Sequence, residues 1–103
     1  MSDLEKCESL EKALSVIGGK WTLLILYNLC FQKRGFNELQ RNIPGISPRI
    51  LSLRLKDLLE HSLISKTVKP TNPPQVDYAI TEKGASLKSI LQQLGSWAES
   101  GKI

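Results

Sequence analysis

The sequence has few of the residues that build metal sites, disulfide frameworks and catalytic centres. Its 103 residues include two cysteines and one histidine, and Cys7, Cys30 and His61 cannot supply a disulfide framework or a four-ligand zinc site. The sequence also lacks the clustered carboxylates or the cysteine–histidine pair from which a catalytic site could be assembled. The segment Gly19–Thr22 lacks the earlier glycine and the preceding strand of a phosphate-binding loop. We therefore expect no metal, no cofactor and no enzyme activity.

A long hydrophobic run is also missing. The longest apolar-rich stretch, residues 21–31, is interrupted by Thr22, Tyr27 and Asn28 and is shorter than the roughly 20 apolar residues that a membrane span needs. No basic start followed by an apolar run and a cleavage site opens the chain. With 41% hydrophobic and 23% charged residues, the composition is typical of a soluble globular protein. We expect one cytoplasmic domain over residues 1–103, with no membrane contact.

The excess of positive charge lies in the middle of the chain. Of the formal net charge of +4, residues 1–31 contribute −1 (three Lys against four acids), and residues 32–83 contribute +4 (nine Lys or Arg against five acids). Residues 84–103 contribute +1 (two Lys against one acid). A basic centre between near-neutral ends favours a surface that faces phosphate groups, flanked by helices with another task.

The first third of the sequence predicts two helices. One apolar face recurs at spacings of three and four residues: Leu4, Cys7, Leu10, Leu14 and Ile17. Ser2 and Glu5 have the spacing of a capping box at its start. Gly18 and Gly19 end this helix, because glycine readily adopts the left-handed conformation of a helix terminus. The next helix begins near Lys20 and is apolar almost all round, which is typical of a helix at the centre of a core.

The middle of the sequence has the pattern of two helices joined by a tight turn. We expect Asn37 to cap a short helix that Pro44 and Gly45 end, with Gln40 reaching back to the cap. Ser47 and Pro48 then start a longer helix, since serine accepts a hydrogen bond from a free backbone N–H and proline is favoured at the first helical position. This helix ends near His61. A short helix, a glycine turn and a longer helix make a helix-turn-helix.

The last third predicts a β-hairpin and a final helix. Residues 64–68 and 76–80 read as strands, and the prolines between them place a stiff loop at a tip that projects into solvent. Thr81 caps a last helix, over which one apolar face carries Leu87, Ile90, Leu91, Leu94, Trp97 and Ala98. The expected fold is mainly α with a small β-hairpin.

Five segments, in this order, resemble a known family. They are Ile17–Thr22, Gly35–Leu39, Ile43–Ser47, the leucines at 51, 55 and 58, and Asp77–Gly84. Together they are similar to the HxlR-type regulators of bacteria and archaea, relatives of the MarR group, over nearly the whole chain. The resemblance implies a winged helix-turn-helix with N- and C-terminal dimerisation helices. It also implies a homodimer that binds pseudo-palindromic double-stranded DNA and regulates transcription.

The helix that begins at Ser47 carries the expected recognition chemistry. Four leucines line one of its faces, and basic and hydroxyl groups lie on the others. Arginine binds guanine bidentately or holds phosphate, serine positions by hydrogen bonding, and an exposed leucine meets a thymine methyl group. Lysines on the hairpin and an arginine on the preceding helix would hold phosphate. The predicted DNA contacts are Ser47, Arg49, Ser52, Leu53, Arg54, Lys56, Lys66, Lys69 and Arg41.

Apolar stripes at both ends of the chain are longer than so small a core requires, which favours a two-fold interface. The predicted dimer contacts are Leu4, Leu10, Leu14, Leu87, Ile90, Leu91, Leu94 and Trp97. The alternative is a winged helix that contacts another protein in a larger complex, and it would need no arginine face on the second motif helix. The residues do not indicate an inducer, an operator sequence or the sign of regulation.

Cys7 has two interpretations. Its place on the apolar face of the first helix predicts a small buried hydrophobe. The resemblance implies instead a redox-active N-terminal cysteine. The family cysteine is usually followed by proline, whereas Glu8 follows Cys7, and the distance to Gly18 is longer by one residue. We expect the buried hydrophobe, and we expect Cys30 to lie in the core.

Overall fold

The computed structural model describes residues 3–102, without the side chains of Leu4, Glu5 and Lys102. The predicted capping box of Ser2 and Glu5 therefore lies outside the described residues. The elements follow the predicted order, except that strand β1 is added, the last helix is broken in two and a further helical turn follows it. They are α1 (Asp3–Ile17), α2 (Lys20–Leu29), β1 (Arg34–Gly35), α3 (Phe36–Asn42), α4 (Pro48–Glu60), β2 (Ile64–Lys69), β3 (Gln75–Ile80), α5 (Glu82–Ala85), α6 (Lys88–Trp97) and a final wide helical turn (Ala98–Lys102).

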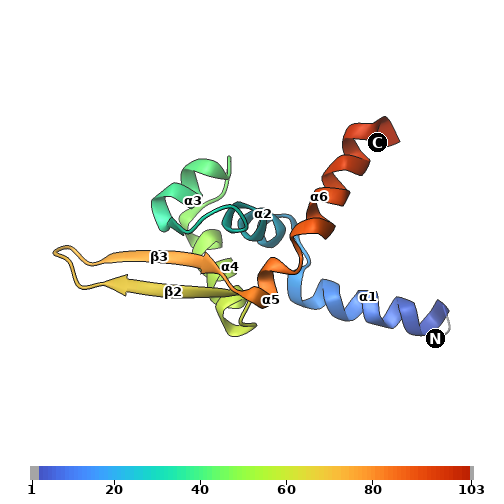
Figure 1. Ribbon diagram of the computed structural model, residues 1–103, viewed down its shortest axis with the longest axis horizontal. Helices are drawn as coiled ribbons and strands as arrows, with labels where there is room; N and C mark the ends of the chain where they lie inside the picture. The colour runs from blue at the N-terminus through green and yellow to red at the C-terminus, as the bar shows by residue number, and fades with distance from the viewer. Residues whose placement is uncertain (1–2, 103) are drawn as a thin grey trace.

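The core lies where α2, α3 and α4 pack against the base of the sheet (Figure 1). Its middle is α2, as the apolar stretch predicts, and Thr22 is buried there beside the aliphatic side chains. Cys30 is only half-buried, so the prediction that it lies in the core is met in part. The buried hydrophobic residues are Ile25, Leu26, Leu29, Leu39, Ile43, Ile46, Leu51, Leu55, Leu58, Leu63, Ile64 and Tyr78.

The sheet has three antiparallel strands in the order β1-β3-β2. In the hairpin, Ile64 lies opposite Ile80 and Lys69 opposite Gln75, so each strand is one residue longer than predicted. The third strand, β1, pairs Arg34 with Tyr78, and sequence reasoning missed it. Two residues are too few to show the alternation that marks a strand. After Ile64 every residue of β2 is exposed, because the hairpin projects beyond the core (Figure 1).

The helix caps around the helix-turn-helix were predicted only in part. Ser47 caps α4 as expected, since its hydroxyl accepts a hydrogen bond from the Ile50 N–H at 3.1 Å. The prediction that Asn37 caps α3 is wrong. The helix begins earlier, after Gly35, and it is the Glu38 carboxylate that accepts a hydrogen bond from the Gly35 N–H at 3.2 Å. Because β1 runs directly into α3, the cap falls at the end of a strand that the sequence pattern does not reveal.

The predicted single last helix is broken in two. Thr81 caps α5 as expected, accepting a hydrogen bond from the Gly84 N–H at 3.1 Å. The helix ends at Ala85 and α6 begins in a new direction at Lys88. This change of direction lets Leu87 and Leu91 pack against the core while Ile90 and Leu94 stay exposed. The apolar stripe is therefore shared between two environments.

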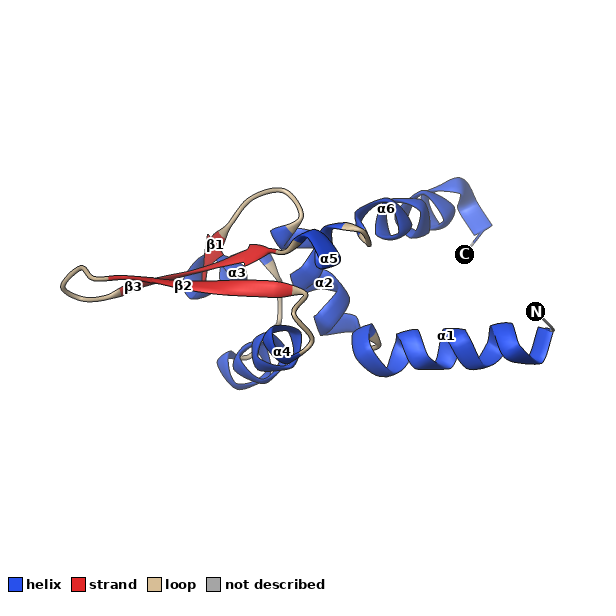
Figure 2. Cartoon of the chain, turned by 60° about the horizontal axis from the view of Figure 1, so that its bottom comes forward, coloured by secondary structure: helices blue, strands red, loops and turns tan. Residues whose placement is uncertain are grey.

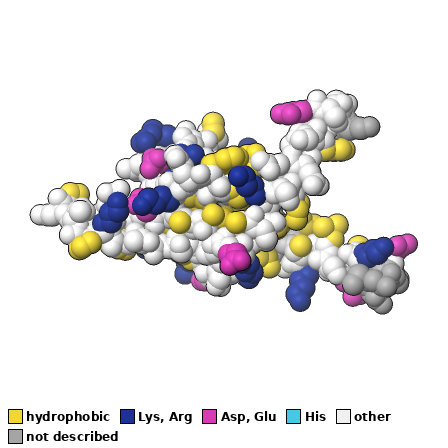
Figure 3. Space-filling model, in the orientation of Figure 1, with side chains coloured by type: hydrophobic (Ala, Val, Ile, Leu, Met, Phe, Trp, Pro, Cys, Tyr) yellow, Lys and Arg dark blue, Asp and Glu magenta, His cyan; other side chains and the backbone are white. Residues whose placement is uncertain are grey.

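Helices α1 and α6 leave the core at the end opposite the hairpin (Figures 1 and 2). The molecule measures 55 × 30 × 23 Å along its principal axes. Hydrophobic side chains remain uncovered where these helices project (Figure 3), and Leu10 and Leu94 are 60% and 53% exposed. No helix among residues 3–102 is both long and apolar enough to span a membrane.

Leucines of α4 provide a test of the core. Leu58 is fully buried and Leu53 is 41% exposed on the same helix. Leu58→Ala should lower the free energy of unfolding by about 2–5 kcal/mol, because it leaves a cavity between α4 and its neighbours. Leu53→Ala should change it by about 0.5 kcal/mol or less. Urea unfolding at one fixed protein concentration measures both, and equal losses would contradict the described packing of α4.

Candidate nucleic-acid interface

Helix α4 is fixed in position at its start, along its inner face and at its end. Ser47 caps its first turn, and Leu51, Leu55 and Leu58 bury its inner face against the core. After the helix, backbone carbonyls that no longer lie within it accept hydrogen bonds from the start of α5. Thr81 Oγ1 donates to the Ser62 carbonyl at 2.7 Å, and Lys83 Nζ donates to the His61 carbonyl at 2.8 Å. The orientation of α4 is therefore fixed by the cap at its start, by the packing of its inner face and by the hydrogen bonds just after its end.

The outer face of α4 presents four of the predicted residues together. Arg49, Ser52, Leu53 and Lys56 are all exposed and follow the spacing i, i+3, i+4 and i+7, which places them along one side of a helix. Within the described residues Arg49 and Lys56 make no ion pair. The face thus carries a free guanidinium, a hydroxyl, an apolar side chain and a free ammonium group.

Arg54 does not lie on this face. On a helix with 3.6 residues per turn it lies about 140° around the axis from Arg49, beside the buried leucines. Its guanidinium makes an ion pair with Asp57, with Nη1 and Oδ2 3.5 Å apart, and its Nε is buried without a hydrogen-bond partner. The prediction grouped Arg54 with the recognition residues by closeness in sequence, whereas the helical turn separates it from them.

The hairpin carries the two predicted lysines in different states. Lys66 is exposed and makes no ion pair among the residues that the structure describes. Lys69 lies 3.8 Å from the Asp77 carboxylate, measured from Nζ to Oδ2, and Asp77 is itself buried. Sequence reasoning missed this acid. In the register of the hairpin Asp77 lies opposite Thr67, and only this pairing shows that its side chain shares a face with Lys69.

Positive charge also surrounds the turn between α3 and α4. Arg41, in the last turn of α3, is exposed and makes no ion pair within residues 3–102. From Leu39 to Lys56 the chain contains no Asp or Glu. The turn and the start of α4 are therefore basic without neighbouring acid on the same segment. Such a surface attracts phosphate groups.

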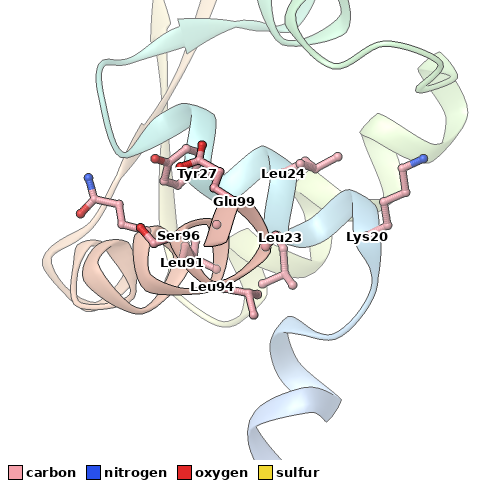
Figure 4. A pocket seen from close by; sticks show the side chains of 11 residues that line it. Lys20, Leu23, Leu24, Tyr27, Leu91, Leu94, Ser96 and Glu99 are labelled. Carbon is pink, nitrogen blue, oxygen red and sulfur yellow. The ribbon is translucent and has the colours of Figure 1, made fainter. Parts of the chain in front are cut away.

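A second surface is apolar. A groove of about 830 Å³ lies between α2 and α6, lined in its middle by Leu23, Leu91 and Leu94 (Figure 4). The predicted dimer residues fall into two groups according to their burial. Leu87 and Leu91 pack partly on the core, whereas Leu10, Leu14, Ile90, Leu94 and Trp97 are exposed. The side chain of Leu4 lies outside the described residues.

The two cysteines differ in environment. The prediction that Cys7 is a buried hydrophobe is wrong for the single chain, because α1 projects from the core and leaves its thiol exposed. At Cys30 burial raises the pKa of the thiol, and the nearby Lys88 partly opposes this increase. Burial likewise raises the pKa of the Tyr78 hydroxyl on β3. No cluster of three or more His, Cys, Asp or Glu suited to a metal occurs in the described part of the chain.

Comparison with known proteins agrees with this arrangement. The HxlR-like helix-turn-helix family matches residues 16–102. An HTH-type transcriptional regulator of Methanothermobacter thermautotrophicus is 42% identical over 99 residues, which cover 96% of this chain and 76% of that protein. The redox regulator HypR in its oxidized form has a TM-score of 0.85 at 38% identity, covering 89% of this chain and 95% of its own. A MarR-family transcriptional regulator from Porphyromonas gingivalis has the same TM-score at 35% identity, covering 96% and 95%.

A three-helix unit followed by a two-stranded wing, with a basic helix facing outward, is the winged helix-turn-helix fold of the MarR-like regulators. The chain belongs to the HxlR-like helix-turn-helix family. Its relatives are transcriptional regulators and not enzymes, which agrees with the expectation from the sequence.

Proposed function

We propose that the protein is a cytoplasmic regulator that acts as one DNA-binding domain. As a homodimer it recognises a pseudo-palindromic site in double-stranded DNA. The observation that carries the proposal is the single exposed face of Arg49, Ser52, Leu53 and Lys56 on α4. A recognition helix of this kind enters the major groove with its N-terminal residues against the base edges. Arg49, in the first turn, is the residue best placed to reach a guanine.

The remaining predicted contacts divide by role. Ser52 hydrogen-bonds to a base or a phosphate, and Leu53 meets the methyl group of a thymine. In the cap of α4 the Ser47 hydroxyl oxygen accepts a hydrogen bond from the Ile50 N–H. The hydroxyl proton of Ser47 is therefore available to donate to a phosphate. Lys56, Lys66 and Arg41 hold the backbone. Lys69 contacts a phosphate only after its ion pair with Asp77 is broken. Arg54 contributes to the electrostatic field rather than to base reading.

The dimer is proposed from the uncovered apolar surface. The exposed apolar side chains of α1 and α6 and the groove between α2 and α6 form an apolar surface, and exposed apolar patches are typical of protein–protein interfaces. A second copy of the chain, related by a two-fold axis, covers the same residues on both partners. The two α4 helices then lie in successive major grooves, with half-sites about 34 Å apart.

Arg49 separates base reading from backbone holding. A binding site selected from a pool of randomised duplexes supplies the specific DNA, and an unselected duplex supplies the reference. Arg49→Ala should weaken binding to the selected site by roughly 1–3 kcal/mol per half-site, because alanine cannot form the two hydrogen bonds that arginine makes with guanine. Binding to random DNA should fall much less. Titrations by fluorescence anisotropy at several salt concentrations measure both affinities.

Two variants serve as controls for Arg49. Lys66→Ala should weaken both duplexes alike and reduce the salt slope by about one unit for each phosphate that the lysine neutralises. Arg54→Ala should leave the ratio of specific to random affinity nearly unchanged, since this side chain lies off the exposed face. If Arg49→Ala also leaves that ratio unchanged, Arg49 does not read a base.

Leu94 and Trp97 test the dimer. Replacing both with Glu should give monomers and abolish specific binding at the same time, because charges would have to be buried at the two-fold interface. Sedimentation velocity at micromolar concentration measures the oligomeric state. Val68→Glu places a charge on an equally exposed apolar residue of the hairpin and should remain dimeric. A monomeric wild type would overturn the proposal.

Redox sensing through Cys7 is a second candidate function. It is favoured by the exposure of the thiol on α1, in a chain similar to a protein described as a redox regulator. An exposed thiol is accessible to oxidants, whereas the raised pKa of Cys30 lowers the thiolate fraction that reacts. Oxidation of Cys7 would act on the surface proposed to form the dimer.

The redox candidate is tested with diamide. Sensing predicts that diamide changes the affinity of the wild type and of Cys30→Ser for the selected duplex, and leaves Cys7→Ser unchanged. Anisotropy before and after treatment, with recovery in dithiothreitol, measures the effect. A wild type that does not respond, or a response that survives in Cys7→Ser, rejects sensing by this residue.

A further inference from the structure

The first turn of α2 lies against the turn of the helix-turn-helix. Trp21 is half-buried and packs against the core cluster. The far edge of its indole, at Cη2, lies 3.8 Å from the position that a Cβ on Gly45 would occupy. Gly45 has a φ of +85° and directs the chain from α3 toward α4. Trp21 therefore joins the start of α2 to the turn that immediately precedes the recognition helix.

Lys20 contacts the ring of the same tryptophan. Its Nζ lies 4.4 Å from the centroid of the Trp21 ring, a cation–π contact that restricts a long and otherwise flexible side chain. The residue is exposed, and within residues 3–102 it makes no ion pair with a carboxylate. A lysine ammonium has three donors. The contact with the ring leaves donors that point away from it available to an anion.

The charges around the turn favour a phosphate as that anion. Arg41 lies in the last turn of α3 and Arg49 in the first turn of α4, so the turn that Trp21 contacts is flanked by two exposed arginines. Both arginines are without ion pairs in the described part of the chain, and the segment between them contains no acid. A DNA backbone that passes the start of α4 would meet three cations contributed by three helices.

The apolar groove is the other surface that Lys20 borders. Lys20 and Glu99 are both among its lining residues, but no ion pair joins them among the described residues. Figure 4 shows the Lys20 side chain pointing away from Leu23, Leu91 and Leu94, which line the middle of the groove. A ligand or helix seated among those leucines would leave the ammonium group outside. The neighbour that connects Lys20 to the rest of the molecule is Trp21, which contacts the turn of the helix-turn-helix.

We propose that Lys20 is a DNA-backbone contact of this regulator, positioned beside the helix-turn-helix by Trp21. The inference rests on the proposed DNA-binding function and adds a contact from a third helix, outside both the recognition helix and the wing. Because it touches phosphate and no base edge, it contributes affinity and register without sequence specificity.

The test is the salt dependence of binding by the full chain. Affinities of wild type and Lys20→Ala are measured from 0.05 to 0.3 M KCl, with the selected duplex and with a random 30-base-pair duplex. Lys20→Ala should weaken both duplexes alike, by about fivefold for each contact at 0.15 M salt, and lower the slope of log K against log salt by about 0.9 for each contact. Lys20→Arg should keep the wild-type slope.

Lys88 provides a matched control. Its Nζ lies 4.8 Å from the centroid of the Phe31 ring, so it makes the same kind of contact away from the turn. Lys88→Ala should leave both the affinities and the slope unchanged. Ethylation interference should show a phosphate whose ethylation weakens binding by the wild type but not by Lys20→Ala. Lys20→Ala and Lys88→Ala should both be dimeric and equally stable to heat.

Two failures are distinguishable. If the wild type binds DNA and Lys20→Ala retains its slope, or if Lys88→Ala weakens binding as much as Lys20→Ala, the Lys20 contact is wrong and the proposed function stands. If the wild type binds neither duplex at low salt, the proposed function is wrong and the Lys20 contact falls with it.

Discussion

The packing of one leucine face of α4 against the core determines what the rest of the molecule can do. Leu51, Leu55 and Leu58 are buried to within a few per cent, and burial of this kind is the main favourable term that fixes a helix in a small domain. Because these three positions are fixed, the opposite side of the helix must face solvent. The exposed face of α4, which is the proposed recognition surface, is thus the consequence of a packing constraint, and its side chains do not take part in the core.

The architecture was predictable because its signals are local. A serine before a proline, a glycine in a turn and leucines at helical spacing each specify a conformation over a few residues, and the structure contains all three where expected. What the sequence did not reveal depends on partners distant along the chain. Strand β1 exists only through its pairing with β3, and at the break between α5 and α6 the side chain of Leu87 packs against the core. The cap of α3 was misplaced because it follows that strand.

The candidate interface was predicted less completely than the fold. Spacing identifies which residues share a helix face, yet Arg54 was included because it is close in sequence, although the turn of the helix separates it from Arg49. The ion pair of Lys69 with Asp77 depends on the register of the hairpin, which composition does not fix. Cys7 was expected to be buried because it lies on the apolar face of the first helix. An apolar face predicts that something covers it, and in the single chain nothing among the described residues does.

The ion pair in the hairpin has a consequence for how quickly the protein samples DNA. A lysine that already has an internal counter-charge gains less from a phosphate than a solvated lysine does, because one ion pair replaces another. Weak non-specific binding shortens the residence time of a regulator on non-target DNA, and fast dissociation lets it move along the duplex by hopping. Under the proposed function, the ion pair with Asp77 lowers the affinity of the hairpin for DNA in general, so the protein leaves non-target sequences sooner.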